Sequence, residues 1–195
     1  MFYRKPLSYS FESLQPYIDE RTMREHYEVH YKKYQDGLNE AIRENGIDPN
    51  LPITEVIKKY FSIKKIRNNG GGFYNHFLYF DNIGPYEHQM SPRLAQLIVD
   101  NFGSYENFLT QFKKAGAEVF GSGWAWLLFQ DNKLKIATTA NQDNPIMNPA
   151  FDNAKILLGM DVWEHAYYLK HMADRKSYMD DFFDVVCWRS VSERL

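Results

Sequence analysis

The histidines and one acidic stretch of this chain have the residue types and the spacing of metal ligands. Six histidines occur in 195 residues, and two of them, His26 and His30, lie four residues apart in a helical pattern. A third, His76, follows a run of glycines, and Asp161 precedes His165 by four residues in the stretch DVWEHAYYLKH. Imidazole and carboxylate groups together suit zinc, iron, manganese or copper.

Taken alone, each histidine could have an ordinary structural role, because a single histidine is more often a packed or surface residue than a metal ligand. The neighbours of these histidines in the sequence favour a role as metal ligands. His165 lies among Trp163, Tyr167 and Tyr168, and His76 lies in the aromatic segment FYNHF. Buried polar groups need partners, so these side chains must bind one another or a cation. The pattern therefore favours a buried metal site.

Two helical stretches must position the first three histidines. Residues 22–45 show apolar or histidine side chains at three- and four-residue steps, which predicts a helix with these side chains along one face. A second helical pattern covers residues 53–80 and contains the run NNGGG. Glycine in a helix costs roughly 1 kcal/mol relative to alanine. Either the helix breaks at this run, or another group must approach its backbone closely.

The later half of the chain mixes helices with strands. Ser91-Pro92 and Ser104 have the features of helix starts, and the helical pattern after Ser104 runs to about residue 119. Residues 124–129 and 133–139 read as two strands around a turn, residues 155–160 as a third strand, and the pattern is helical again from residue 177. We predict an α+β fold: a long N-terminal helical hairpin, residues 1–89, followed by an α/β domain with a small three-stranded antiparallel sheet, residues 90–195.

Length and composition exclude several classes of protein. A single cysteine, Cys187, rules out an internal disulfide and a cysteine-based zinc or iron–sulfur site, and it fits a reducing compartment. The first residues show no secretory signal, and no stretch approaches the ~18 apolar residues that span a membrane. The net charge of −2 argues against nucleic-acid binding. We expect a cytoplasmic protein with no membrane or nucleic-acid partner, and neither Cys187 nor His88 receives a function.

In four blocks the chain resembles the iron/manganese superoxide dismutase family. The blocks are the pattern His26-x-x-x-His30-x-x-x-Tyr34, the string NNGGGFYNH, the string GSGWAWL followed by ANQD, and the string DVWEHAYY. They occur in the family's order, and the similarity extends from Leu7 to Leu195. The resemblance implies a helical hairpin followed by an α/β domain, with the metal held between them.

The resemblance also assigns roles to individual residues. It implies four metal ligands, which are His26, His76, Asp161 and His165. It implies three catalytic residues, which are the gateway pair His30 and Tyr34 and the solvent-binding Gln142. It implies an aromatic wall around the metal cavity, made by Trp124, Trp126 and Trp163. Glu164 and Tyr168 match residues that cross the subunit interface of a homodimer, and Arg175 matches a basic residue at the mouth of the substrate funnel.

The implied reaction converts superoxide to dioxygen and hydrogen peroxide by alternating one-electron oxidation and reduction, coupled to proton uptake. The implied cofactor is one manganese ion per subunit, because glycines fill NNGGG and the glutamine, Gln142, lies on the later segment. Iron, or use of both metals, stays open, as does a tetramer in place of the dimer.

Five positions depart from the family's common pattern and bear on rate and metal preference. Tyr27 and Tyr31 stand where histidines are frequent, Val29 where a lysine is common, Phe80 where tryptophan is usual, and His171 where tyrosine is usual. None of them is a predicted ligand. Phe80 removes an indole from the cavity wall, and Val29 weakens the charge of the funnel. We expect Lys32, Lys33 or Arg175 to supply the local positive charge that steers a small anion toward the opening.

Three other functions compete with this interpretation. A non-catalytic manganese- or iron-binding protein would use the same ligands but would need no proton relay from Tyr34. A zinc hydrolase needs room for its substrate, and the Trp and Tyr side chains leave little. A non-haem oxygenase uses two histidines and one carboxylate, whereas a third histidine here takes a position that it needs free.

Overall fold

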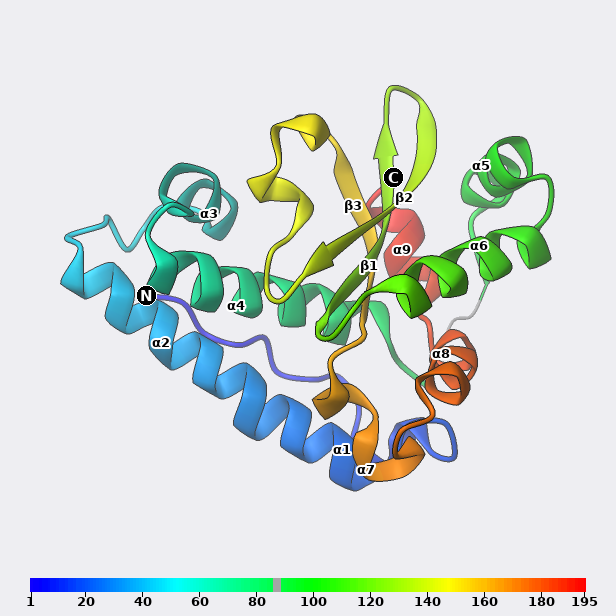
Figure 1. Ribbon diagram of the computed structural model, residues 1–195, viewed down its shortest axis with the longest axis horizontal. Helices are drawn as coiled ribbons and strands as arrows, with labels where there is room; N and C mark the ends of the chain where they lie inside the picture. The colour runs from blue at the N-terminus through cyan, green and yellow to red at the C-terminus, as the bar shows by residue number, and fades with distance from the viewer. Residues whose placement is uncertain (86–88) are drawn as a thin grey trace.

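The computed structural model describes residues 1–85 and 89–195, so His88 lies outside the described residues. The chain forms a helical N-terminal part and a mixed C-terminal part (Figure 1). The α-helices are α1 (Glu20–Arg24), α2 (Lys32–Glu44), α3 (Ile53–Tyr60), α4 (Lys64–Asn82), α5 (Pro92–Phe102), α6 (Tyr105–Glu118), α7 (Tyr168–His171), α8 (Arg175–Asp184) and α9 (Trp188–Glu193). The strands are β1 (Gly123–Gln130), β2 (Lys133–Ala140) and β3 (Lys155–Asp161). Among the described residues, no helix is long and apolar enough to cross a bilayer.

The first helical stretch contains a π-helical segment, Glu25–Tyr31, which joins α1 to α2. A π turn holds one residue more than an α turn. His26 and Tyr31, five residues apart, are therefore both buried, whereas His30 is half-buried. The predicted extent of the helix is confirmed, but His30 does not share the fully buried face that a regular helix would give it.

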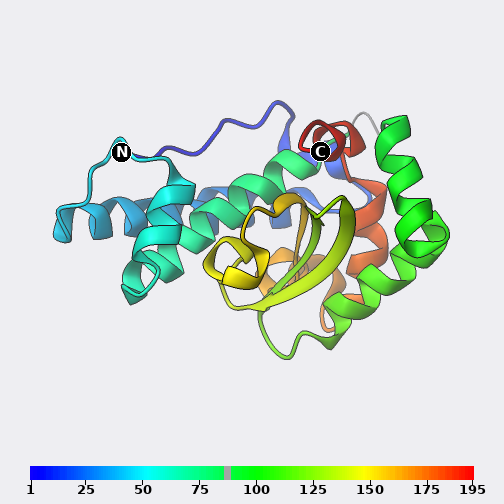
Figure 2. The ribbon, with the colours of Figure 1, turned by 90° about the horizontal axis from the view of Figure 1, so that it is seen from above.

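The second helical stretch is two helices rather than one. The chain turns at residues 61–63, so that α3 packs against α4, which a single straight helix could not do. The glycine run lies inside α4 and does not break it. α4 pairs with α2 to form the predicted hairpin, and its later half packs against β3 (Figures 1 and 2).

The C-terminal part has the predicted three-stranded antiparallel sheet, in the order β2-β1-β3, with α6 packed against β1 and β2. Side chains of Ser91 and Ser104 cap α5 and α6 by accepting backbone N–H bonds from Leu94 and Asn107. The final helical pattern is interrupted between α8 and α9, because Val186 forms a β-bridge with Ile83 there.

The end of α4 fixes the free edge of β3. Asn82 is fully buried; its Nδ2 donates to the carbonyl of Leu157 at 3.1 Å, and its Oδ1 accepts from the N–H of Gly159 at 3.1 Å. An unpaired strand edge is thereby covered by a side chain. Gly159 lies opposite Trp126 in the ladder, and Asp161 lies opposite Trp124. The register of β3 therefore places Asp161 in the interior between the two parts of the chain.

We expect Asn82→Ala to lower the free energy of unfolding by about 1–3 kcal/mol, because the backbone groups of Leu157 and Gly159 would stay buried without these bonds. Urea denaturation measures the change. Asn68→Ala, on the exposed side of the same helix, is the matched control and should change stability by no more than about 0.5 kcal/mol. Equal losses in the two variants would contradict the role given to Asn82.

Candidate metal centre

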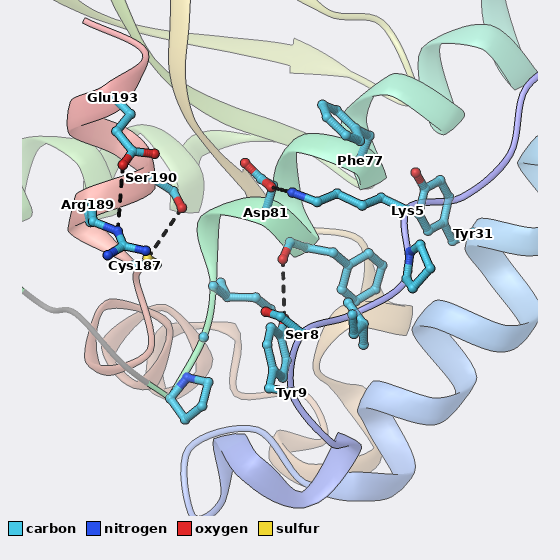
Figure 3. A pocket seen from close by; sticks show the side chains of 16 residues that line it. Lys5, Ser8, Tyr9, Tyr31, Phe77, Asp81, Cys187, Arg189, Ser190 and Glu193 are labelled. Carbon is cyan, nitrogen blue, oxygen red and sulfur yellow. Dashed lines mark hydrogen bonds and ion pairs between the residues drawn. The ribbon is translucent and has the colours of Figure 1, made fainter.

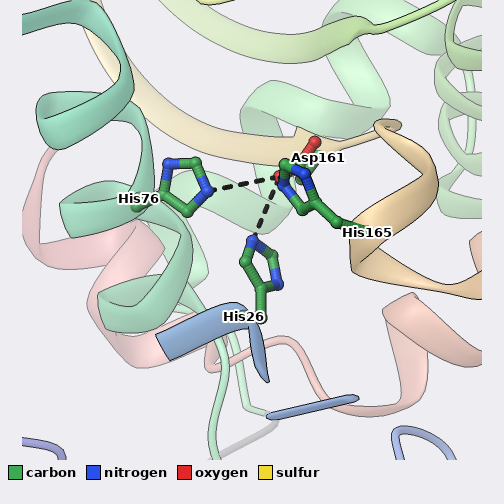
Figure 4. Close-up of side chains that lie close together, drawn as sticks. All are labelled: His26, His76, Asp161 and His165. Atoms are coloured by element: carbon green, nitrogen blue, oxygen red, sulfur yellow. Dashed lines mark hydrogen bonds and ion pairs between the residues drawn. The ribbon is translucent and has the colours of Figure 1, made fainter. Parts of the chain in front are cut away.

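Four side chains from separate elements meet between the two parts of the chain (Figure 4). His26 comes from the π-helical segment, His76 from α4, Asp161 from the end of β3, and His165 from the short 3-10 helix Glu164–Ala166. One ligand atom from each residue lies within 4.8 Å of the others. The structure thus brings together the four residues predicted as ligands.

Three imidazoles direct their Nε2 atoms toward one carboxylate oxygen. The distances from Asp161 Oδ2 are 3.0 Å to His165, 3.2 Å to His26 and 3.7 Å to His76. His26, His76 and Asp161 are completely buried. The Nε2 atoms of His26 and His76 make no hydrogen bond with the described residues, and the 3.2 Å contact lacks hydrogen-bond geometry. Buried polar atoms without partners are rare, so this arrangement fits a bound cation.

The protonation of these groups suits a metal. Burial lowers the pKa of His26 to about 4 and lowers that of His76 well below its ordinary value. Burial opposes ionisation of Asp161, yet His165 and His26 hold the pKa of its carboxyl below the ordinary value. Metal binding requires neutral imidazoles and an ionised carboxylate, which is the state that these shifts favour.

A backbone carbonyl orients one of the ligands. His76 Nδ1 lies 2.7 Å from the carbonyl oxygen of Gly72. A carbonyl can only accept, so Nδ1 carries the proton and donates it. The lone pair of His76 then lies on Nε2, on the side of Asp161. Hydrogen bonds of this kind commonly set the tautomer of metal-binding histidines.

A chain of buried amides leads away from the ligands. Gln142 Nε2 donates to the hydroxyl of Tyr34 at 2.9 Å, and Gln142 Oε1 accepts from Trp124 Nε1 and from Asn75 Nδ2, both at 3.1 Å. Asn144 Nδ2 in turn donates to Asn75 Oδ1 at 2.9 Å. An indole N–H can only donate, so the orientation of the Gln142 amide is fixed. Sequence reasoning found Gln142 and Tyr34 but missed Asn75 and Asn144.

Two glycines of α4 leave room for this chain of hydrogen bonds. A Cβ atom at Gly71 would collide with the backbone carbonyl of Gln142, and one at Gly72 would collide with the ring of Tyr34. Gly70 has ordinary space around it. The glycine run therefore admits a close neighbour, which is the second of the two explanations that the sequence left open.

Tyr34 and His30 lie beside the ligands without replacing them. The ring of Tyr34 is 5.0 Å from that of His76, and burial together with the charge of Asp161 raises the pKa of Tyr34 to about 12. His30 stacks on His165 at 4.2 Å, and burial lowers the pKa of His30 to about 4. At neutral pH, Tyr34 keeps its proton and His30 carries no charge.

The predicted aromatic wall has an inner and an outer layer. Trp124 meets His76 edge-on at 5.4 Å, and Trp163 stacks on His165 at 5.4 Å. Trp126 instead stacks on Trp124 at 5.3 Å. A Cβ atom at the residue opposite Trp126, Gly159, would collide with its indole ring.

Other aromatic residues complete the wall on the side of α4. The rings of Tyr79 and Phe80 lie 4.8 and 5.0 Å from that of His26, and the ring of Tyr31 stacks on His76 at 5.8 Å. Sequence reasoning named Phe80 and Tyr31 as departures from the family and missed Tyr79. The helical spacing of Tyr79, three residues after His76, could have indicated it.

A surface cleft opens onto Tyr34, Gln142 and Trp163, and its rim carries the cations Lys64 and Arg67. Arg67 forms an ion pair with Asp143. Sequence reasoning missed both cations and offered Lys32, Lys33 or Arg175 as the source of positive charge.

Those three residues lie elsewhere. Lys32 and Lys33 line a separate surface groove. Arg175 donates to the carbonyls of Val119 and Gly121, both at 2.8 Å, and thereby holds a loop. Of the predicted interface residues, Glu164 is exposed and Tyr168 is 46% exposed.

Two domain models of a single family match the chain. Residues 2–84 match the alpha-hairpin domain of iron/manganese superoxide dismutases, and residues 90–194 match their C-terminal domain.

Curated relatives agree with this match. The manganese superoxide dismutase of Acinetobacter baylyi is 42% identical over 200 residues, covering 99% of this chain and 86% of the relative. Manganese superoxide dismutase 1 of Leptolyngbya boryana is 42% identical over 197 residues, covering 97% and 78%. The manganese superoxide dismutase of Shigella flexneri is 40% identical over 202 residues, covering 100% and 98%. The chain therefore belongs to the iron/manganese superoxide dismutase family.

Proposed function

We propose that this chain is a superoxide dismutase, which converts two superoxide anions and two protons into dioxygen and hydrogen peroxide. The observation that carries the proposal is the convergence of three imidazole nitrogens on Asp161 Oδ2. The hydrogen bond from Gln142 to Tyr34 supports catalysis rather than storage, because a storage site needs no proton donor beside the metal. The names of the relatives support the same activity.

The cofactor that we propose is one manganese ion per subunit, held by His26, His76, Asp161 and His165. Manganese supplies a one-electron change between its +3 and +2 states, which zinc lacks. Iron accepts the same donor set, so iron is the alternative metal. The room that Gly71 leaves for Gln142 supports manganese, since this arrangement matches the manganese-type pattern in the sequence.

The side chains around the cleft attract and admit the substrate. Lys64 adds positive charge at the rim beside the ion pair of Arg67 with Asp143, and this charge favours the approach of a small anion. Trp163 and Tyr34 narrow the inner end of the cleft. The ring of His30 stacks on that of His165, and this crowding favours a small substrate over a larger one.

Tyr34 is the residue that we propose as proton donor. Its hydroxyl oxygen accepts from Gln142 Nε2, so its own O–H proton points elsewhere and can be donated in the cavity. Burial keeps the hydroxyl protonated. Gln142 cannot rotate its amide without losing the bond from Trp124 Nε1, and this holds the hydroxyl of Tyr34 in place.

We also propose that the protein assembles as a homodimer through a surface near Glu164 and Tyr168. Phe120 is fully exposed in the loop that Arg175 holds, and Tyr168 and Met172, a few residues before Arg175 in the chain, are exposed as well. Large apolar side chains that are exposed on several neighbouring segments commonly mark an interface. A reducing, cytoplasmic setting is part of the proposal and is supported by the single cysteine.

Apo-protein reloaded separately with manganese and with iron tests the proposed function. We expect superoxide turnover with manganese and much weaker turnover with iron, with metal content measured on the same samples. Comparable turnover with both metals would keep the enzyme and remove the preference. Full loading without turnover from either metal would leave a metal-binding protein.

We expect Tyr34→Phe to retain the metal and to slow turnover at high superoxide concentration by roughly 10- to 100-fold, because the substitution removes the proton donor. Stopped-flow kinetics of superoxide decay measures the change. Tyr60→Phe, in α3 and half-buried, should leave the rate unaltered. Unchanged kinetics in Tyr34→Phe would remove the role proposed for this hydroxyl.

We expect Phe120→Asp to weaken the dimer by at least about 30-fold, since a charge would replace a large apolar side chain in the interface. Sedimentation equilibrium measures the association. Tyr3→Asp changes another exposed aromatic residue and should leave the association as it is. A dimer of undiminished strength in Phe120→Asp would place the interface elsewhere.

A further inference from the structure

Two asparagine-proline pairs follow β2, and the two asparagines have different surroundings. Asn144-Pro145 and Asn148-Pro149 each open a short 3-10 helix. The side-chain oxygen of each asparagine accepts a backbone N–H two residues later, at 3.2 Å for Asn144 and 3.0 Å for Asn148. Asn148 is exposed, whereas Asn144 is 1% exposed. A capping asparagine uses only its oxygen, so the buried nitrogen of Asn144 needs a partner of its own.

That partner is another buried amide. Asn144 Nδ2 donates to Asn75 Oδ1 at 2.9 Å. Asn75 is fully buried in α4, and its own Nδ2 donates to the backbone carbonyl and to Oε1 of Gln142, both at 3.1 Å. Because the cap uses the oxygen of Asn144, its nitrogen must face Asn75. Asn75 must then present its oxygen to Asn144 and its nitrogen to Gln142.

The orientation of the Asn75 amide decides whether it holds Gln142 or repels it. If this amide turned over, its oxygen would lie against two oxygens of Gln142, and its nitrogen would lie against that of Asn144. Neither contact could be a hydrogen bond. The bond from Asn144 therefore opposes the turn and keeps both donations to Gln142 in place.

Solvent in two hollows beside α4 does not replace this bond. One is the surface cleft that opens onto Tyr34, and the other is a cavity of about 360 Å³ between the N-terminal segment, α4 and α9 (Figure 3). Gln142 lines the cleft, but Asn75 and Asn144 line neither hollow. Loss of the Asn144 nitrogen would thus leave Asn75 Oδ1 buried without a partner, which is costly.

We propose that Asn144 is a positioning residue, which holds the amide of Gln142 in place through one intervening amide. Gln142 in turn bonds to Tyr34 and Trp124, whose rings lie 5.0 and 5.4 Å from that of the ligand His76. Groups packed around metal ligands tune the redox potential of the metal. Asn144 acts on that potential from behind Gln142. The proposal rests on the proposed function, because it concerns the same metal centre.

The reduction potential of the manganese-loaded protein, measured by spectroelectrochemical titration without superoxide, tests this role. Asn144→Ser keeps a capping oxygen but loses the donor to Asn75. We expect it to shift the potential in the same direction as Gln142→Ala and by a smaller amount. Asn148→Ser makes the same change at the exposed cap and should leave the potential unaltered. Metal content and circular dichroism of the same samples check loading and folding, and Asn144→Thr, which also keeps a capping hydroxyl, has the same expected result.

A double variant separates action through Gln142 from a general disturbance of the fold. In the Gln142→Ala background, Asn144→Ser should cause no further shift, because the residue through which it acts has lost its amide. An equal shift in both backgrounds would overturn the proposal, and so would an unchanged potential in Asn144→Ser alone. Superoxide turnover is measured separately on the same samples. Loaded protein without turnover would reject the dismutase, whereas the potentials would still decide the role of Asn144.

Discussion

The carboxylate of Asp161 lies completely buried with three imidazole nitrogens turned toward one of its oxygens. A buried charge is costly unless it is paired, and neutral imidazoles pair with it poorly. A cation among the four groups removes this cost. The folding of the chain and the binding of metal are therefore linked, because the two parts of the protein meet at buried polar side chains that share one ion.

The polar groups around this centre form a chain of hydrogen bonds in which each donor and each acceptor is fixed. Trp124 can only donate, so Gln142 must present its oxygen to the indole and its nitrogen to Tyr34. Asn75 adds a second donor to the same oxygen. The position of the Tyr34 hydroxyl, which we propose as the proton donor, thus depends on Trp124, a residue of β1 that does not line the cleft. The packed indole of Trp124 therefore holds the amide of Gln142 in a single orientation.

Much of this could be predicted from the sequence, because the signals are local. The periods of the helices and strands gave the fold, and the four blocks gave the ligands. What could not be predicted depends on contacts between distant residues. Asn82 pairs with Gly159, and Asn75 with Gln142, across 77 and 67 residues. The rim cation Lys64 was missed because the direction of an exposed lysine follows from helix packing, which no local pattern contains.

The π-helical segment, Glu25–Tyr31, has a consequence for the angular phase of the first helix. In a regular α-helix, eight residues rotate the chain by about 800°, which would leave Tyr34 about 80° out of phase with His26. A wider π turn rotates less per residue and reduces this offset. One residue more per turn therefore lets the side chains of His26 and Tyr34 face the same cavity. The angle between the two side chains around the helix axis depends on the number of residues per turn between them. Keeping His26 and Tyr34 while losing the π-helical segment would therefore not preserve this angle.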